Sequence, residues 1–370
     1  MMRKTLRPIR PNPLMAMRMA MILLFEWWRE GERPEKYPEG VSESRGSRDS
    51  SAMLARAAER ILSFGPWPQG RPVLLACSGG ADSTFLACAW RHVAQNKRDY
   101  GDFALPEAQV VVVDHGHRSG SESDALQAQS LYSDLGFATQ ILAAEAPADA
   151  RETTLRTYRY RALEQAAAER NASALLFAHH ADDHAETVLL RILRGTGLEG
   201  LRGIPSRRAM GPDLQLQRPL LEFSAADIRK TLREIGQPWI EDSTNADASE
   251  AARNHLRHHA FPALEPLATA SPQSALRRLA VEAEDWAAAR DAILAAYSNW
   301  GDLPSYLRRY AIRLCLKEVK ATVSPARLLD LEGALLRRGS AKIDAHHCLK
   351  WEGGRLRQEP TSVDQVEEEG

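Results

Sequence analysis

The sequence contains little cysteine: only Cys77, Cys88, Cys315 and Cys348 occur among its 370 residues. No two of them form a C-x-x-C pair, which excludes the usual signatures of a zinc knuckle, an iron–sulfur centre or a dithiol site. So few cysteines in a chain of this length are typical of a reducing compartment. We therefore expect a cytoplasmic protein.

The sequence also lacks a long apolar run and an excess of one charge. No stretch approaches the roughly 18 consecutive apolar residues of a membrane span, so we expect no membrane association. The 48 basic residues nearly balance the 49 acidic ones, which leaves a net charge of -1. A polyanion could therefore be bound only if basic residues gathered on one face. The 44% hydrophobic and 26% charged residues are ordinary for a globular protein and exclude disorder as the state of the main body.

Residues 1–52 differ from the rest of the chain. A basic start precedes an apolar stretch at 14–25, but Arg18 interrupts it, and charged and tryptophan residues follow it. A secretory signal would need small residues there for cleavage, so secretion is disfavoured. Residues 31–52 are rich in Glu, Ser, Gly, Arg and Pro, a composition typical of disorder. We expect this extension to be disordered or to result from a start codon assigned too early.

From Met53 onward, short apolar segments alternate with helical patterns. The predicted strands are 73–77, 108–113, 139–143 and 174–178, and the predicted helices between and after them are 84–93, 153–170 and 181–194. The four consecutive valines at 110–113 are typical of a strand that is buried on both faces. This alternation predicts an α/β fold with a doubly wound parallel sheet, in which ligands bind at the carboxyl ends of the strands.

After Ile204 the pattern becomes mainly helical. Ser224 is a suitable N-cap for a helix over 224–235, and Gly236 a suitable stop. Later segments predict helices at 273–297, 304–319 and 325–338, then a hairpin of 342–349 and 355–358 around two glycines. We therefore expect an α/β domain at 53–265, a smaller, mostly helical domain at 270–358 and an acidic tail at 359–370.

The strongest motif is Ser78-Gly79-Gly80-Ala81-Asp82-Ser83, between a predicted strand and a predicted helix. Its glycines permit a tight turn, and backbone N–H groups at a helix start attract anions. Asp82 would repel a phosphate unless Mg²⁺ lay between them, so we expect Asp82 to bind Mg²⁺. Neither the G-K-[ST] element of a Walker A loop nor a G-x-G-x-x-G fingerprint is present. The alternative is an ordinary strand-to-helix turn, but such a turn does not need two glycines together with two serines and an aspartate.

Two further motifs follow predicted strands. The segment 114–118, with sequence DHGHR, includes Asp114 and His115; the segment 179–187, HHADDHAET, follows the strand at 174–178. In the second motif, His179, Asp183 and Glu186 have the spacing of one helix face, which could ligate Mg²⁺ or bind a cationic substrate. The dipole of the helix would explain one or two carboxylates there, but it does not explain two adjacent histidines.

A basic stretch, Arg191–Arg208, contains four glycines and carries a charge of +4. We expect it to form a flexible loop that suits a phosphate backbone, although a solvated charged surface is the alternative. The segment 239–245, WIEDSTN, followed by Arg253, Asn254 and Arg257, is weak on its own and could be a capped loop before a helix.

In this order, the motifs resemble the N-type ATP pyrophosphatase (PP-loop) superfamily and, within it, the tRNA(Ile)-lysidine synthases. The resemblance runs from about Leu74 to Pro262 and, more loosely, over 305–358. It rests on SGGADS, VDHGHR, LRTYRY, AHHADDHAET, LRGTGLEGL, QRPLL and WIEDSTN before ARNHLR. Residues 1–52 have no counterpart, His117 replaces a usual leucine, and the C-terminal region is short.

The resemblance implies a ligase that forms a carbon–nitrogen bond. Such an enzyme uses ATP to adenylate the C2 oxygen of the wobble cytidine in tRNA(Ile) with a CAU anticodon, and it releases pyrophosphate. The amine of free L-lysine then attacks C2 and displaces AMP, which gives lysidine. A tRNA-binding role for the helical domain and a homodimer are further expectations.

The resemblance also implies roles for individual residues. The loop Ser78, Gly79, Gly80, Ala81, Asp82 and Ser83 would bind the pyrophosphate end of ATP, with Mg²⁺ at Asp82. Asp114 and His115 would lie near the nucleotide. Catalysis would involve Asp82, His179, Asp183 and Glu186, of which Asp183 and Glu186 would pair with the lysine ammonium. The predicted contacts to phosphate groups of the substrate are Arg191, Arg194 and Arg253.

Two alternatives remain open at this point. Another PP-loop enzyme, such as a tRNA thiolase, would typically need paired cysteines, and a glutamine-dependent ligase would need an additional glutaminase domain. A non-enzymatic ATP- or RNA-binding module would not need the carboxylates of the 179–187 motif.

Overall fold

The structure is a computed structural model, and it describes residues 50–101, 104–114, 120–144, 147, 152–241 and 248–361. Residues Met1–Met53 and Leu54–Gly370 form two units, and the second contains all the motifs discussed here. The predictions for 1–49, for His115 and for the acidic tail beyond 361 lie outside the described residues. Helix α2 spans Ser50–Leu62, so the prediction of disorder is wrong for Ser50–Ala52.

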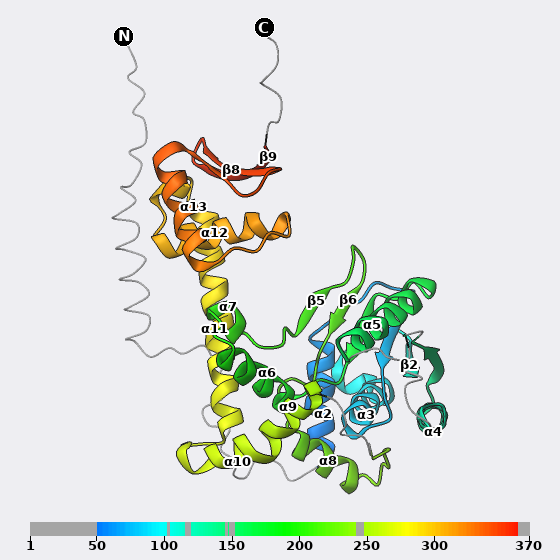
Figure 1. Cartoon of the computed structure of the whole chain (residues 1–370). Coiled ribbons are helices and arrows are strands. Elements are labelled where there is room, and N and C mark those ends of the chain that lie inside the picture. Colours follow the sequence, from blue (N-terminus) through cyan, green and yellow to red (C-terminus); the bar gives the residue numbers. More distant parts are fainter. Residues whose placement is uncertain are drawn as a thin grey trace, which may run out of the picture. The chain divides into compact units, whose positions relative to one another are not determined.

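A six-stranded sheet in the order β3-β2-β1-β4-β6-β5 organises the α/β region (Figure 1). The parallel strands are β1 (Val73–Ala76), β2 (Ala108–Asp114), β3 (Ala138–Ala143), β4 (Ala174–Phe177) and β6 (Gln215–Gln217). Leu74, Leu175 and Leu216, from three of these strands, are fully buried in one core cluster. The predicted parallel α/β sheet is confirmed: the apolar runs form its strands, and neighbouring residues of β1, β2 and β4 are buried, as in strands covered on both faces.

The edge strand β5 (Arg207–Ala209) runs antiparallel to β6. The sequence analysis placed these residues in a flexible loop, and that part of the prediction is wrong. Alternation along β5 sends neighbouring side chains to opposite faces of the sheet. Arg207 and Arg208 therefore have different surroundings, although both are exposed.

Helices connect and flank these strands. They are α3 (Ala81–Gln95), α4 (Ser121–Asp134), α5 (Glu152–Glu169), α6 (Ala181–Leu193), α7 (Leu198–Leu201), α8 (Ala225–Glu234), α9 (Ala248–His255) and α10 (Phe261–Leu264), with a π-helical turn at Leu256–Ala260. Helix α3 begins three residues earlier than predicted, which brings Asp82 into its first turn. Helix α8 begins as predicted, because the Ser224 side chain accepts a hydrogen bond from the Asp227 N–H.

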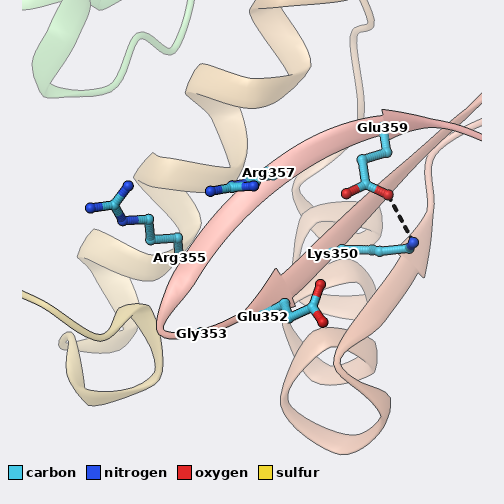
Figure 2. Close-up of a pocket in the computed structure, with 6 residues that line it drawn as sticks. All are labelled: Lys350, Glu352, Gly353, Arg355, Arg357 and Glu359. Carbon is cyan, nitrogen blue, oxygen red and sulfur yellow. Dashed lines mark ion pairs between the residues drawn. The ribbon is translucent and has the colours of Figure 1, made fainter.

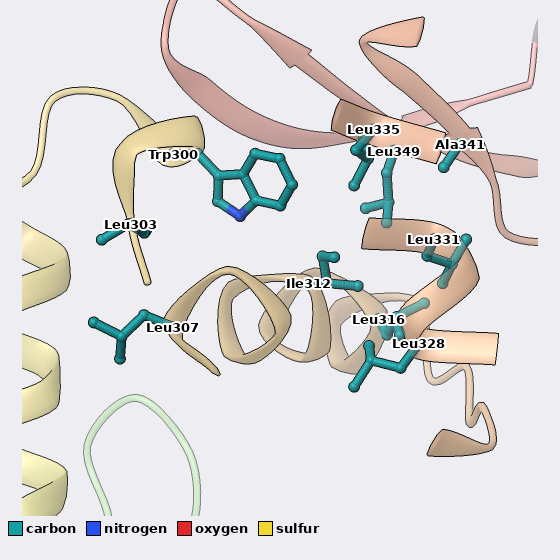
Figure 3. Packing of buried hydrophobic residues seen from close by; sticks show 10 residues of the cluster. All are labelled: Trp300, Leu303, Leu307, Ile312, Leu316, Leu328, Leu331, Leu335, Ala341 and Leu349. Atoms are coloured by element: carbon teal, nitrogen blue, oxygen red, sulfur yellow. The ribbon is translucent and has the colours of Figure 1, made fainter. Parts of the chain in front are cut away.

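The C-terminal region consists of α11 (Pro272–Ala296), α12 (Ser305–Glu318), α13 (Pro325–Arg338) and a three-stranded antiparallel sheet. Its core gathers leucines of α12 and α13 around Ile312 and Trp300 (Figure 3). The sheet contains β7 (Ser340–Lys342), β8 (His347–Glu352) and β9 (Arg355–Pro360). The predicted hairpin around Gly353 and Gly354 is confirmed by β8 and β9, but its first strand does not begin at Lys342 as predicted. Asp344 accepts hydrogen bonds from the N–H groups of His346 and His347, and this turn separates β7 from β8.

No helix in the described part of the chain is both long enough and apolar enough to cross a membrane.

Candidate active site

A pocket of about 220 Å³ lies where β1, β2 and β4 end. Its lining includes Ser78, Gly80, Asp82 and Ser83 of the first motif, together with His179 and Asp183 of the third. Ligands of doubly wound sheets bind at this edge. Two motifs that are about 100 residues apart in the sequence therefore meet in one pocket.

The backbone at Gly79 requires glycine. Its φ of +91° is unfavourable for other residues, and a Cβ atom there would lie 2.6 Å from Cδ1 of Ile240. The Gly79 carbonyl accepts a hydrogen bond from the N–H of Ile240 at 2.9 Å. The loop is thus held against Ile240, and the absence of a side chain at Gly79 allows this close approach.

Tyr132 holds the same loop from the other side. Its hydroxyl accepts a hydrogen bond from the Gly79 N–H at 3.1 Å and lies 3.0 Å from Oγ of Ser83. The side chain is fully buried. The sequence analysis missed both Tyr132 and its helix α4, whose buried positions Ala125, Ala128 and Tyr132 follow helical spacing with little apolar bulk.

Asp82 is the least satisfied carboxylate of the pocket. Its Oδ1 is buried and has no hydrogen-bond partner among the described residues, and its Oδ2 lies 3.6 Å from Nε2 of His180. Burial raises the pKa of Asp82, and His180 opposes this effect. No group of three or more His, Cys, Asp or Glu residues in the described ranges could hold a metal ion. However, Mg²⁺ commonly uses one or two carboxylates together with substrate phosphates, and a single unsatisfied Asp82 fits that arrangement.

His180 caps helix α6. Its Nδ1 accepts hydrogen bonds from the N–H groups of Asp182 and Asp183 at 3.2 and 3.4 Å, and Asp183 accepts one in return from the His180 N–H at 3.1 Å. Such a reciprocal cap fixes the first turn of a helix. Because the helix begins at Ala181, the prediction that His179 shares a helix face with Asp183 and Glu186 is wrong for His179.

His179 instead precedes the helix and lines the pocket. Its ring stacks on Phe177 with 5.8 Å between the ring centroids. Burial lowers the pKa of His179 to about 3; Asp183 opposes this shift, and Arg218, Arg156 and Arg159 add to it. His179 is therefore a neutral imidazole at neutral pH, which can donate or accept one hydrogen bond but cannot supply positive charge.

Asp183 and Glu186 lie together and share an arginine that the predicted site did not include. Nη2 of Arg257 lies 3.2 Å from Oδ1 of Asp183 and 3.0 Å from Oε2 of Glu186, and its Nε donates a second hydrogen bond to Glu186. Arg253 is more distant, with its Nε 3.9 Å from the same carboxylate. The two acids predicted to bind an ammonium group therefore already contact a cation of this chain.

Burial affects the two acids differently. It raises the pKa of the fully buried Glu186 despite the opposing contact with Arg257. Burial also acts to raise the pKa of Asp183, but the nearby His180 and His179 outweigh it and hold this pKa below its ordinary value. Glu186 is therefore the carboxylate whose negative charge is less well compensated.

Other predicted site residues lie outside the pocket lining. Arg191 donates hydrogen bonds to the carbonyls of Gly200 and Gly203 at 3.0 and 2.7 Å, so it holds the segment after α6. Arg194 is exposed beyond the end of this helix. Asp114 ends β2, and its carbonyl accepts a hydrogen bond from the Ala144 N–H at 2.8 Å. Contacts of these residues with substrate stay predictions.

Comparisons with known proteins agree with this geometry. A family model described as a PP-loop domain matches residues 53–264. A tRNA(Ile)-lysidine synthase from Methylobacterium nodulans is 34% identical over 321 residues, which cover 82% of this chain and 89% of that protein. One from Salinispora arenicola is 40% identical over 218 residues, which cover 58% and 62%.

Other matches are shorter or show the fold alone. The chain spans 43% of the length of a tRNA(Ile)-lysidine synthase from Pseudomonas fluorescens, at 34% identity, with 54% of this chain covered. It likewise spans 62% of the Salinispora arenicola protein, and 62% and 54% of two further relatives of that name. Among solved structures, a U34-tRNA thiolase from Methanococcus maripaludis matches with a TM-score of 0.51 at 14% identity, covering 64% of this chain and 80% of the thiolase.

Proposed function

Because the chain belongs to the tRNA(Ile)-lysidine synthase family of PP-loop proteins, we propose that it converts the wobble cytidine of tRNA(Ile) with a CAU anticodon to lysidine. The substrates would be that tRNA, ATP and L-lysine. One observation carries the proposal: a single pocket brings the Ser78–Ser83 loop together with His179 and Asp183. An ATP-activating loop and a site for a cationic amine are the two parts that the reaction requires.

In the first half-reaction, the cytidine C2 oxygen attacks the α-phosphorus of ATP and pyrophosphate leaves. The N–H groups of Ala81, Asp82 and Ser83 lie in the first turn of α3, where backbone donors lack acceptors within the helix. They would bind the pyrophosphate end of ATP. Tyr132 and Ile240 fix Gly79, so the loop needs little rearrangement when the nucleotide binds.

Asp82 would hold the Mg²⁺ that accompanies ATP, since its Oδ1 is buried without a partner in the described structure. The ion would supply positive charge for the phosphate oxygens. The neutral His179, which lines the same pocket as Asp82, would orient a substrate group by a hydrogen bond.

In the second half-reaction, the lysine amine attacks C2, the C2–O bond breaks, and AMP leaves with the oxygen while the amine loses a proton. Asp183 and Glu186 would hold the lysine ammonium, as oppositely charged groups must when an ammonium is buried. Arg257 competes for the same two carboxylates. Lysine binding would therefore require the guanidinium of Arg257 to move or to share them.

The C-terminal sheet would provide a second contact with tRNA. A pocket of about 430 Å³ lies on β8 and β9, lined by Lys350, Glu352, Gly353, Arg355, Arg357 and Glu359 (Figure 2). Lys350 is paired with Glu359 at 2.8 Å. Arg355 and Arg357 have no carboxylate within ion-pair distance in the described part of the chain, so they are available to phosphates.

The alternative of a tRNA thiolase has less support. Burial raises the pKa of the Cys77 thiol, which lines the pocket, to about 12. Cys88 is also buried, and burial raises its pKa to about 12 as well. Sulfur chemistry needs a thiolate, and neither cysteine provides one near neutral pH. The homodimer and the cytoplasmic location stay predictions.

Mass spectrometry of the tRNA tests the proposed function. The full chain is incubated with unmodified tRNA(Ile), ATP and lysine, and the nucleosides are then analysed. We expect a cytidine heavier by one lysine less one water, formed with stoichiometric AMP and pyrophosphate. A transcript with uridine at the wobble position is the control and should remain unchanged. Unmodified cytidine, or no pyrophosphate release that depends on tRNA, would contradict the proposal.

A further inference from the structure

Three arginines gather around one tyrosine at the carboxyl edge of the sheet. Arg156 of α5 and Arg208 of β5 each place their guanidinium carbon 5.2 Å from the ring centroid of Tyr160. Arg156 also donates a hydrogen bond to the Tyr160 hydroxyl at 3.2 Å. Arg218, just after the end of β6, contacts the same side chain. Helix α5, the edge strand and the residue after β6 thus contribute one positive charge each.

The described residues do not neutralise this cluster. None of their carboxylates lies within ion-pair distance of Arg156, Arg208 or Arg218. Arg218 is only 4% exposed, its Nη1 donates to the Pro205 carbonyl at 2.7 Å, and its buried Nε has no hydrogen-bond partner among the residues that the structure describes. A buried charge without a counter-ion is costly, and nearby like charges raise that cost. An anionic ligand would remove the penalty.

The cluster is adjacent to the candidate active site. Tyr160 stacks on Phe177, with 5.5 Å between ring centroids, and Phe177 stacks in turn on His179. Phe177 and His179 both line the pocket. Arg218 follows β6 and His179 follows β4, and these two strands are direct neighbours in the sheet. A group bound by the three arginines would therefore lie next to whatever occupies the pocket.

We propose that Arg156, Arg208 and Arg218 form a binding site for a backbone phosphate of the tRNA beside the reacting nucleotide. Guanidinium groups suit this ligand, because their fixed donors match phosphate oxygens. The Ser78–Ser83 loop after β1 already serves the pyrophosphate end of ATP. The cluster instead involves α5, the residue after β6 and the edge strand β5, where Arg208 is exposed and a large substrate can reach it. The choice of RNA as the source of phosphate rests on the proposed function.

Neighbouring arginines on β5 provide a matched test. Arg208→Ala removes an exposed member of the cluster. Arg207→Ala removes an equally charged neighbour that contacts Phe64 and donates to the Ser63 carbonyl at 2.7 Å instead. The affinity of the full chain for tRNA(Ile) is measured at several salt concentrations without ATP. We expect Arg208→Ala to lower the slope of log affinity against log salt by about 0.7–0.9, the value for one phosphate contact, and Arg207→Ala to leave it unchanged. Arg208→Lys, which keeps the charge, should retain most of the slope.

A second measurement separates the possible sources of phosphate. ATP binding is titrated without tRNA, and we expect the same affinity for Arg208→Ala as for the parent protein. A loss of ATP affinity with an unchanged tRNA slope would assign the site to ATP and overturn the proposal. Equal effects of Arg207→Ala and Arg208→Ala would reduce the cluster to general surface charge and would overturn it as well.

Lysidine formation is scored separately by mass spectrometry. If the parent protein binds tRNA through Arg208 but forms no lysidine, the phosphate site stands and the proposed function fails. If lysidine forms and the slope does not depend on Arg208, the proposed function stands and the phosphate site is wrong.

Discussion

Two glutamates are buried against arginines in different regions of the chain, and their pKa values are shifted in opposite directions. Burial raises the pKa of Glu186 in α6 above its ordinary value, despite its contact with Arg257. Burial also acts to raise the pKa of Glu332 in α13, but hydrogen bonds from Ser305 and two arginines outweigh it and lower this pKa. The C-terminal core thus satisfies its own charge, whereas the contacts of α6 compensate the Glu186 carboxylate less well. Such a deficit is typical of a group that also serves a ligand.

Substitution of Asp82 tests the comparison of satisfied and unsatisfied carboxylates most strongly, because one oxygen of Asp82 is buried without a hydrogen-bond partner in the described structure. We expect Asp82→Asn to slow pyrophosphate release that depends on tRNA by about 1000-fold, equivalent to roughly 4 kcal/mol of lost charge stabilisation. The stability of the protein should not fall. The matched control is Asp182→Asn, since Asp182 Oδ2 already accepts a hydrogen bond from the Ala225 N–H at 2.8 Å. If Asp182→Asn slowed pyrophosphate release and Asp82→Asn did not, an unsatisfied carboxylate would not be a sign of function.

Glu186→Gln tests the member of the pair that lies in α6, beside Asp183. We expect the lysine concentration for half-maximal rate to rise about 10- to 100-fold, as the loss of a charge-assisted contact of roughly 1.5–3 kcal/mol implies. Pyrophosphate release without lysine should continue. A carboxyl group whose pKa is raised on folding binds more protons in the native state, so its charge destabilises the protein at neutral pH. The Tm at pH 7 should therefore not fall. A lower Tm with unchanged lysine dependence would make Glu186 a structural group.

Glu332→Gln tests the C-terminal member. We expect a loss of about 2 kcal/mol in the free energy of unfolding at pH 7, because hydrogen bonds to a buried carboxylate are removed. A pKa lowered on folding adds stability above the unfolded value of about 4.5, and this contribution disappears as pH falls through the folded value. Denaturant unfolding of both proteins should therefore converge in acid. A difference that stayed constant with pH would show that packing, and not charge, is responsible.

Tyr132→Phe should have the smallest effect and would show whether the contrast extends to uncharged groups. The variant removes one hydroxyl and leaves the Gly79 N–H without its acceptor. We expect the KM for ATP to rise roughly fivefold, in line with a hydrogen bond of about 1 kcal/mol. The KM for lysine should not change, because Tyr132 contacts only the loop end of the site. Equal increases in both KM values would indicate a general loss of structure.

The sequence predicted the sheet and its loop because both have local signatures. Strands buried on both faces read as apolar runs, and the Ser78–Ser83 loop combines glycines, hydroxyls and a carboxylate between a strand and a helix. The carboxyl-edge rule then placed His179 and Asp183 near that loop, and the pocket confirms it. The division of the chain at about residue 265 stays a prediction.

The parts that were missed depend on distant or weak signals. Helix α4 buries mainly alanines beside Tyr132, so its apolar stripe is faint. Arg257 meets Glu186 across 71 residues, and no local pattern shows which arginine will fold onto which carboxylate. The strand β5 has only three residues and consists mostly of arginine, a composition that suggests a loop. In each case tertiary packing decides what propensity leaves open.

The cap of helix α6 has a consequence for how the two halves of the site communicate. Nδ1 of His180 accepts two backbone N–H groups, which leaves Nε2 facing the acids, 3.6 Å from Oδ2 of Asp82 and 3.5 Å from Oδ2 of Asp183. One imidazole thus stands between the carboxylate of the Ser78–Ser83 loop, the proposed ATP site, and a carboxylate of the proposed amine site. A ligand that shifts either acid acts on the same ring. Thermodynamic linkage then requires reciprocity: whatever factor ATP introduces into the affinity for lysine, lysine must introduce into the affinity for ATP.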